Sequence, residues 1–192
     1  MLHVLRQIAR TGIKTEPKPS PAAEMVIVAR LQENILRTLG RALTIRQVDA
    51  GSCNGCELEI HALGNPYYNL EGLGIKFVAS PRHADMLLVT GPVSKHMEIA
   101  LKRTYDATPD PKLVVAVGDC GCTGGFFGES YATCGRVANV IPVDVAIPGC
   151  PPTPTALLQG ILAAIAAAAP PDERVEPTAG LGDSAPPDLP SP

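Results

Sequence analysis

The stretch Asp49-Ala-Gly-Ser-Cys-Asn-Gly-Cys-Glu-Leu-Glu59 places two cysteines, Cys53 and Cys56, one helical turn apart, directly after an apolar, strand-like run. A Cys-x-x-Cys turn brings two thiolates within reach of one metal centre, and the small Asn54 and Gly55 let backbone N–H groups approach the sulfurs. The same spacing occurs in thioredoxin-like redox motifs and in one half of a structural zinc site. The pair alone therefore leaves three kinds of chemistry open.

Two later cysteines follow apolar runs that end in glycine, as the first pair follows an apolar run. Cys120 comes after residues 112–118, and Cys150 comes after residues 143–149. If these runs are parallel strands of one open α/β sheet, their carboxyl ends lie at the same edge, where such folds place their ligands. Three separate turns would then bring four thiolates to one crevice. The candidate site residues are Cys53, Cys56, Cys120 and Cys150.

Four thiolates suit either a zinc ion or an iron-sulfur cluster. Compact structural zinc sites usually consist of two short knuckles, whereas here one pair is joined by single cysteines from remote turns. Cys150 is followed by Pro151, as in many loops that bind clusters. The pattern favours a cluster over zinc, and favours both over disulfides.

Five motifs occur in order along the chain: Gly51-Ser-Cys-Asn-Gly-Cys-Glu57, Ser80-Pro-Arg-His-Ala-Asp85, Thr90-Gly-Pro-Val93, Gly118-Asp-Cys-Gly-Cys-Thr-Gly-Gly125 and Val143-Asp-Val-Ala-Ile-Pro-Gly-Cys-Pro-Pro-Thr-Pro154. Together they resemble the small subunit of membrane-bound, group 4 nickel-iron hydrogenases of the formate hydrogenlyase type. That family is homologous to the 20 kDa subunit of respiratory NADH:quinone oxidoreductase (complex I). The resemblance extends over about residues 43–165.

The resemblance implies that these four cysteines bind the iron of one [4Fe-4S] cluster proximal to an active site. The quinone-reductase branch usually carries two adjacent cysteines at the first position, whereas here Asn54 and Gly55 separate them, as in the hydrogenase branch. Cys122 stands where relatives often carry a residue without a thiol. It is either a competing ligand or, like Cys134, a small buried apolar residue, which is the commoner role of a free cysteine.

The function implied by this resemblance is that of an iron-sulfur electron-transfer subunit in a membrane-associated, hydrogenase-like oxidoreductase complex. The subunit would relay single electrons to or from a large subunit, which carries the nickel-iron site in that family. Further implied partners are a ferredoxin-like iron-sulfur subunit and membrane-arm subunits, which would hold the chain at the cytoplasmic face of the inner (plasma) membrane. Two alternatives stay open: the 20 kDa subunit of a complex-I-like NADH/quinone oxidoreductase, and a zinc-stabilised scaffold subunit.

The amino-acid composition limits the possible classes of protein and partner. The 192-residue chain has a net charge of −3, no Trp and 4% aromatic residues, which argues against nucleic acid as a partner. Its length suits one domain with extensions, and its 45% hydrophobic content is enough for a core. No secretory signal with an uninterrupted apolar segment opens the chain, so the cysteines are not expected to form an extracellular disulfide framework.

Three regions are expected along the chain. Residues 1–24 combine a short basic amphipathic helix, or a terminus without a binding role, with a Pro-rich spacer. Residues 25–169 form the α/β iron-sulfur domain, which begins with a helix near 28–39. Residues 170–192, rich in Pro, Asp, Ala and Gly, form a disordered tail.

Alternating apolar runs and helical patterns predict a doubly wound, mostly parallel α/β sheet of the flavodoxin-like kind, with the cluster at the carboxyl ends of its strands. Strands are expected near 43–48, 74–79, 86–91, 112–118 and 143–147, and helices near 56–64, 95–107 and 154–169. The last helix is almost wholly apolar but shorter than the roughly 20 residues of a membrane span. Any membrane attachment is therefore expected to be through partners.

Other residues have expected roles around this site. Glu57 and Glu59 open the helix after the cysteines, where the helix dipole favours a carboxylate, and Glu57 could also tune the cluster or pass protons. Arg82 and His83 lie in a loop and are either solvated or in contact with a partner. Residues 90–94 should line the cluster cavity. Glycines around the third ligand fit neither a P-loop nor a dinucleotide fingerprint, and so favour close approach of backbone N–H groups to a cluster.

Overall fold

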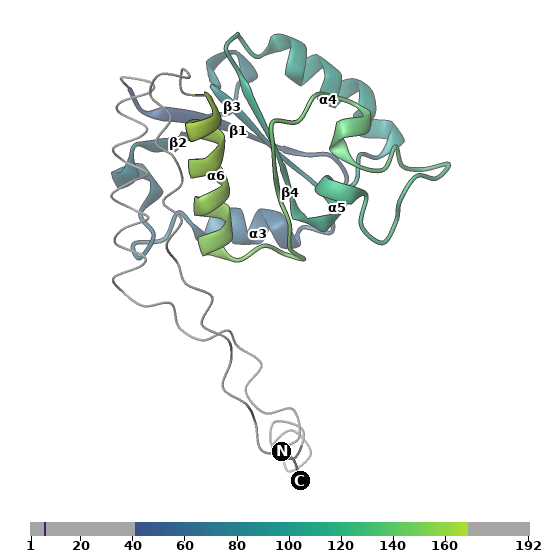
Figure 1. Cartoon of the computed structure of the whole chain (residues 1–192), viewed down its shortest axis with the longest axis horizontal. Coiled ribbons are helices and arrows are strands. Elements are labelled where there is room, and N and C mark those ends of the chain that lie inside the picture. The colour runs from purple at the N-terminus through teal and green to yellow at the C-terminus, as the bar shows by residue number, and fades with distance from the viewer. Residues whose placement is uncertain (1–5, 7–40, 169–192) are drawn as a thin grey trace.

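The protein, described here by a computed structural model at residue 6 and residues 41–168, contains a five-stranded parallel sheet flanked by helices (Figure 1). Apart from residue 6, the predicted N-terminal helix, the spacer, the second helix and the tail lie outside the described residues. The strands are β1 (Leu43–Asp49), β2 (Ile75–Phe77), β3 (Met86–Thr90), β4 (Leu113–Val117) and β5 (Val145–Ile147). The helices are α3 (Gly55–Ala62), α4 (Lys95–Ala107), α5 (Gly118–Thr123) and α6 (Pro154–Ala168), with 3₁₀ turns η1 (Leu70–Leu73), η2 (Pro81–His83) and η3 (Val137–Asn139).

The strand order β2-β1-β3-β4-β5 is the flavodoxin-like order, which confirms the expected fold class. The order reverses between β1 and β3, and open α/β sheets bind their ligands outside the carboxyl ends of the strands at such a point. The register aligns these ends, because Asp49 pairs with Thr90, Thr90 with Val117, and Val117 with Ile147. The turns that carry cysteines thus leave the sheet at one level.

Each face of the sheet has its own apolar core. On one face, α3 and α6 supply Ile60, Leu157 and Ile161, which pack with Leu43 and Val117. On the other face, α4 and η3 supply Leu101 and Val137, which pack with strand residues such as Val89. β3 is buried along its whole length, as expected for a central parallel strand that is covered on both faces.

Within residues 41–168, the predicted strands and helices correspond to observed ones, with one addition. The run 112–118 ends one residue early as a strand, and Gly118 instead opens α5, a short helix that carries Cys120 and that the sequence patterns did not predict. β2 and β5 are shorter than expected, at three residues each. In the described part of the chain, no helix combines the length and the apolarity needed to cross a bilayer.

Candidate functional site

The Cys53–Cys56 turn is shaped by the aspartate that ends β1. One carboxylate oxygen of Asp49, Oδ1, accepts the N–H groups of Gly51 and Ser52 at 2.8 and 2.9 Å, which bends the chain as it leaves the strand. Asn54 then adopts a left-handed conformation (φ 74°) at the N-terminal cap of α3. Cys53 is exposed, while Cys56 lies half-buried in the first turn of α3.

The loop after β3 fixes this turn against the middle of the sheet. The N–H of Ala50 donates to the carbonyl of Thr90 at 3.1 Å, and the N–H of Ser94 donates to the carbonyl of Ala50 at 2.8 Å. Gly91 (φ +76°) lies so close to Ser52 that an added Cβ would approach its backbone nitrogen to 2.6 Å. The predicted 90–94 segment therefore does pack against the cysteine turn.

Cys120 lies in the middle of α5, which directly follows β4. The glycine-rich segment that contains Gly125 and Phe126 packs against it. The N–H of Phe126 donates to its sulfur, and a Cβ on Gly125 would come within 2.6 Å of that sulfur. Burial, followed by the nearby charges of Cys150, Cys53 and Asp119, raises the pKa of the Cys120 thiol, while the Phe126 N–H opposes the rise. Glycine thus permits the backbone to approach the Cys120 sulfur closely.

Cys150 is exposed in the turn between β5 and α6. Asp119, next to Cys120, joins the two turns by a pair of hydrogen bonds. Its N–H donates to the carbonyl of Gly149 at 2.9 Å, and its carboxylate accepts the N–H of Gly149 at 2.8 Å. The third and fourth predicted site residues are therefore attached to each other through their neighbours.

The structure brings the four predicted site residues into electrostatic range of one another. Burial, then the charge of Glu57, then those of Cys53, Cys120 and Cys150 raise the pKa of the Cys56 thiol to about 12. Gly118 makes this approach possible, since a Cβ there would lie 2.6 Å from the Cys56 sulfur. Within the described ranges, no three His, Cys, Asp or Glu side chains are grouped closely enough to hold a single metal ion.

The other two cysteines lie apart from this group. The Cys122 thiol donates to the carbonyl of Ala116 at 3.5 Å, and its side chain packs against the apolar core on the α4 face. Burial raises its pKa, and no other cysteine contributes to that rise. Cys134 is 9% exposed in the same core and donates to Glu98 Oε2 at 3.3 Å. Cys134 is thus a small buried side chain, and Cys122 is a partly buried one packed against the same core.

Glu57 has a more specific environment than a helix-capping role provides. It is only 5% exposed, and Oε1 accepts a hydrogen bond from the hydroxyl of Thr90, while Oε2 is buried without a hydrogen-bond partner. The side chain of Asn54, the N-cap of α3, makes no capping hydrogen bond, and the Glu57 carboxylate is bound to Thr90 of β3 instead of to the helix end. Arg82 and His83 are exposed in η2, as one of their expected roles requires.

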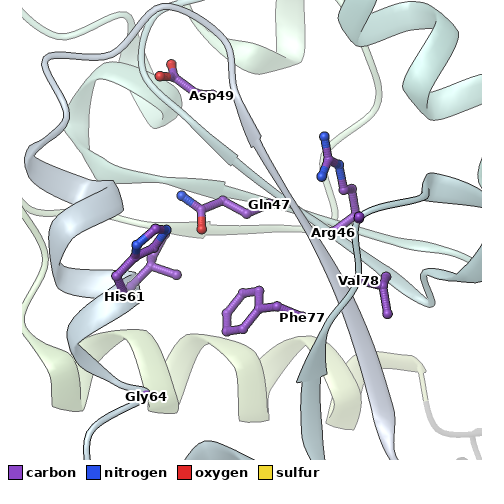
Figure 2. A pocket seen from close by; sticks show the side chains of 9 residues that line it. Arg46, Gln47, Asp49, His61, Gly64, Phe77 and Val78 are labelled. Atoms are coloured by element: carbon purple, nitrogen blue, oxygen red, sulfur yellow. The ribbon is translucent and has the colours of Figure 1, made fainter.

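A pocket of about 660 Å³ opens between the carboxyl half of β1, α3 and the segment after β2 (Figure 2). The side chains of Gln47, His61 and Phe77 point into it, and Asp49, which shapes the cysteine turn, also lines it. Sequence reasoning missed this pocket because its residues come from three separate elements without a common motif. It missed Asp119 as well, although an Asp directly before a site cysteine is a visible signal.

These features define a class: a flavodoxin-like α/β protein whose cysteines gather at the carboxyl edge of the sheet. Residues 53–164 match the family described as NADH ubiquinone oxidoreductase, 20 Kd subunit. The chain belongs to this family, which is the one that the sequence motifs resembled. Its class is thus that of an oxidoreductase-complex subunit.

Proteins with similar sequences are named as subunits of several complexes. The chain is 43% identical over 147 residues to formate hydrogenlyase subunit 7 of Escherichia coli, covering 77% of this chain and 58% of that protein. It is 47% identical over 139 residues to the probable membrane-bound hydrogenase subunit mbhJ of Pyrococcus furiosus, covering 71% and 83%. It is 46% identical over 130 residues to an NADH-quinone oxidoreductase subunit of Desulfovibrio desulfuricans, covering 67% and 69%.

Solved structures agree with the fold. A chain of the membrane-bound sulfane sulfur reductase, an archaeal respiratory membrane complex, superposes with a TM-score of 0.58 at 35% identity, over 70% of this chain and 73% of that one. A chain of an NAD⁺-reducing [NiFe]-hydrogenase superposes with a TM-score of 0.51 at 18% identity, over 64% and 92%, and shows the fold alone.

Proposed function

We propose that the chain is the electron-transfer subunit of a membrane-associated, hydrogenase-like complex, and that Cys53, Cys56, Cys120 and Cys150 hold one [4Fe-4S] cluster. The observation that carries the proposal is that the segments after β1, β4 and β5 bring these four thiols within electrostatic range of one another, whereas no cysteine contributes to the raised pKa of Cys122. The names of the relatives, which include hydrogenase and NADH-quinone oxidoreductase subunits, support the same class of complex.

The residues present fit such a group. Four thiols are the donor set of a cubane cluster, and Gly118 and Gly125 leave the space beside Cys56 and Cys120 that a Cβ would fill. When bound, the cluster would accept or release one electron at a time. The chain's own residues hold the sulfurs in place, shield two of them from water, and donate the Phe126 N–H to a ligand sulfur.

The two exposed thiols, Cys53 and Cys150, place one side of the site at the surface. A partner that exchanges electrons needs such access. We therefore assign a hydrogenase-like large subunit, a ferredoxin-like iron-sulfur subunit and membrane-arm subunits as partners, with attachment to the cytoplasmic side of the membrane through them.

The test is metal and acid-labile sulfide analysis with low-temperature EPR on the full-length chain, purified without oxygen. Single Cys→Ser changes at the four site positions are each expected to remove iron, sulfide and the EPR signal. The matched control is Cys122→Ser, a cysteine of the same α5 helix that should leave the cluster in place. Stoichiometric zinc without sulfide would support the scaffold alternative and reject the electron-transfer role.

One observation favours a second function, quinone reduction in a complex-I-like assembly. The pocket in Figure 2 has the volume of a small-molecule site and combines Phe77 with polar Gln47 and His61. Asp49 belongs both to its lining and to the cysteine turn, so an occupant would lie near the site. A quinone analogue that protects Phe77 but not exposed Tyr131 from photo-oxidative labelling would support this function, and equal labelling of both would reject it.

A further inference from the structure

The pairing between β4 and β5 stops just before it reaches the cysteines. The ladder pairs Val115 with Val145, Ala116 with Ala146, and Val117 with Ile147, and β5 is only three residues long at the edge of the sheet. The next residue, Pro148, has no N–H to donate, so a regular ladder cannot continue toward Cys150. Something other than strand pairing must therefore hold the Cys150 turn.

The two hydrogen bonds between Asp119 and Gly149 provide that connection. The backbone bond of 2.9 Å and the side-chain bond of 2.8 Å point in opposite directions and form a closed ring between the two turns. Asp119 is adjacent to Cys120 and Gly149 is adjacent to Cys150. The ring therefore restricts the separation of the two thiols more directly than any strand contact does.

We propose that Asp119 is a positioning residue that fixes the Cys120 turn relative to the Cys150 turn, so that the site is set for its cluster before the cluster binds. This inference rests on the cluster assignment made above. It adds a residue that binds no metal itself but acts through the Gly149 N–H. Outer groups of this kind typically change metal affinity by about 10- to 100-fold when removed.

The carboxylate also brings a negative charge close to the sulfurs. An added electron makes a cluster more negative, so a nearby anion disfavours the reduced form and lowers the reduction potential. Asp119→Asn keeps an oxygen that can accept the Gly149 N–H but removes the charge. Asp119→Ala removes both, so the two variants separate positioning from charge.

The chain contains a matched control for this test. At the other end of the same two strands, the Asp144 carboxylate accepts the N–H of Val114 at 2.7 Å, and its own N–H donates to the carbonyl of Val114 at 2.9 Å. This ring has the same chemistry as the Asp119 ring but lies at the amino ends of β4 and β5, away from the cysteines. Asp144→Ala therefore reports the cost of loosening the strand pair alone.

The experiment compares the full-length wild type with Asp119→Asn, Asp119→Ala and Asp144→Ala after anaerobic loading with iron and sulfide. We expect Asp119→Ala to retain iron and sulfide about tenfold less well than wild type, and Asp144→Ala to retain them normally. Asp119→Asn should load like wild type and show a higher midpoint potential in an EPR redox titration. Equal retention in the two alanine variants, or equal loss in both Asp119 variants, would overturn the proposal.

A second readout does not need the cluster. In the metal-free chain, hydrogen exchange at the Gly149 amide should be slow in wild type and in Asp119→Asn, and fast in Asp119→Ala. Suppose that wild type fails to bind iron and sulfide, but Gly149 exchanges slowly in wild type and Asp119→Asn and fast in Asp119→Ala. The cluster assignment would then be rejected, while the positioning of the Gly149 turn by Asp119 would still hold. Fast exchange at Gly149 in wild type would overturn the positioning role itself.

Discussion

Gly118 shows how a single missing Cβ sets the position of Cys56. Its φ of +79° is unfavourable for other residues, and an added Cβ would lie 2.6 Å from the Cys56 sulfur. Gly128 has a similar positive φ of +54° but no atom within 4 Å of the added Cβ. The two glycines therefore separate the cost of backbone strain from the cost of the clash.

We expect Gly118→Ala and Gly128→Ala each to lower the free energy of unfolding by about 1–3 kcal/mol through strain. Only Gly118→Ala should also displace Cys56 and reduce iron and sulfide binding. Urea unfolding followed by metal analysis checks both effects. Normal iron binding in Gly118→Ala would show that the Cys56 sulfur can move aside freely.

The raised pKa of Cys56 predicts a pH profile for the metal-free protein. Because the folded-state pKa is about 12 and the ordinary pKa of a cysteine thiol is 9.0, the thiol stays protonated between these values in the folded state only. The contribution of the protonated Cys56 thiol to folding stability is fully present below pH 9 and is lost as the pH rises toward 12. Iodoacetamide labelling of Cys56, read by mass spectrometry, should therefore remain slow well above pH 9.

Glu57 supplies the control for that profile. Its charge is the second contribution to the rise after burial, so Glu57→Gln should move the labelling curve of Cys56 to lower pH. An unchanged curve would mean that burial alone is responsible.

Single residues also mark the limit of what the sequence predicts. The site cysteines could be found because each follows an apolar run, and sheet topology alone brings such positions together. The Glu57–Thr90 contact could not, because the two residues are far apart in the sequence and meet only through the pairing of Asp49 with Thr90. The Asp119 ring likewise depends on the register of β4 and β5.

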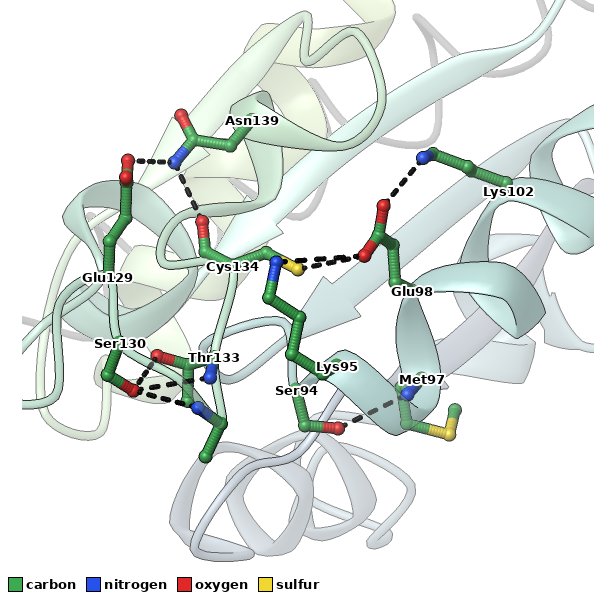
Figure 3. Close-up of polar contacts among 11 residues, drawn as sticks. Ser94, Lys95, Met97, Glu98, Lys102, Glu129, Ser130, Thr133, Cys134 and Asn139 are labelled. Atoms are coloured by element: carbon green, nitrogen blue, oxygen red, sulfur yellow. Dashed lines mark hydrogen bonds and ion pairs between the residues drawn. The ribbon is translucent and has the colours of Figure 1, made fainter.

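Among the elements, the connection between α5 and η3 is held to α4 by a polar network (Figure 3). Glu98 of α4 accepts from Lys102 Nζ at 2.7 Å and from the Cys134 thiol at 3.3 Å, and Lys95 Nζ lies 3.9 Å away. The N–H of Lys95 also donates to the carbonyl of Ala132 at 2.8 Å. This connection carries Phe126 and Tyr131, which are 97% and 98% exposed.

We expect acid to loosen this connection. The hydrogen bond from Lys102, followed by that from Cys134 and by the lysine charges, lowers the pKa of Glu98 below its ordinary 4.5. The stability that the ionised Glu98 carboxylate provides is therefore present above pH 4.5 and is lost as the pH falls through the lowered pKa. Hydrogen exchange at Ala132 and Cys134 should accelerate over that range in wild type.

Glu98→Gln is the control for the acid effect, because its side chain cannot titrate. Exchange in this variant should be faster than wild type at neutral pH and should not accelerate further through protonation at this position. A wild-type acceleration that persists unchanged in Glu98→Gln would assign the effect to another group.

α5 is the element that sequence patterns could not predict. The run Gly118-Asp-Cys-Gly-Cys-Thr123 has two glycines and no apolar periodicity, and its intrinsic helix propensity is low. The helix exists because tertiary contacts hold it in place. Asp119 is bound to Gly149, and Gly121 packs beneath β3, where a Cβ would lie 3.4 Å from the carbonyl oxygen of Val89.

On the scale of the whole molecule, the four thiols belong to turns that follow β1, β4 and β5, with β3 lying between β1 and β4. A group bound to all four would connect both halves of the sheet. Binding to the folded state alone stabilises that state by linkage. We therefore expect anaerobic loading with iron and sulfide to raise the Tm of the full-length chain, as measured by differential scanning calorimetry.

Cys150→Ser and Cys122→Ser form the matched pair for this measurement. The first should abolish the rise in Tm, and the second should preserve it, because Cys122 packs in the core on the α4 face. A rise of equal size in Cys150→Ser would show that the bound group does not reach β5.

The order of the strands along the chain also determines when the site can be completed during synthesis. Cys53 and Cys56 leave the ribosome early, but β5 and Cys150 follow only after all the other strands. At about 5–20 residues per second, the thiols made first wait several seconds for the last one. The newly made chain thus passes through a period with reduced, unligated cysteines, so its maturation depends on protection from oxidants until the edge strand has paired.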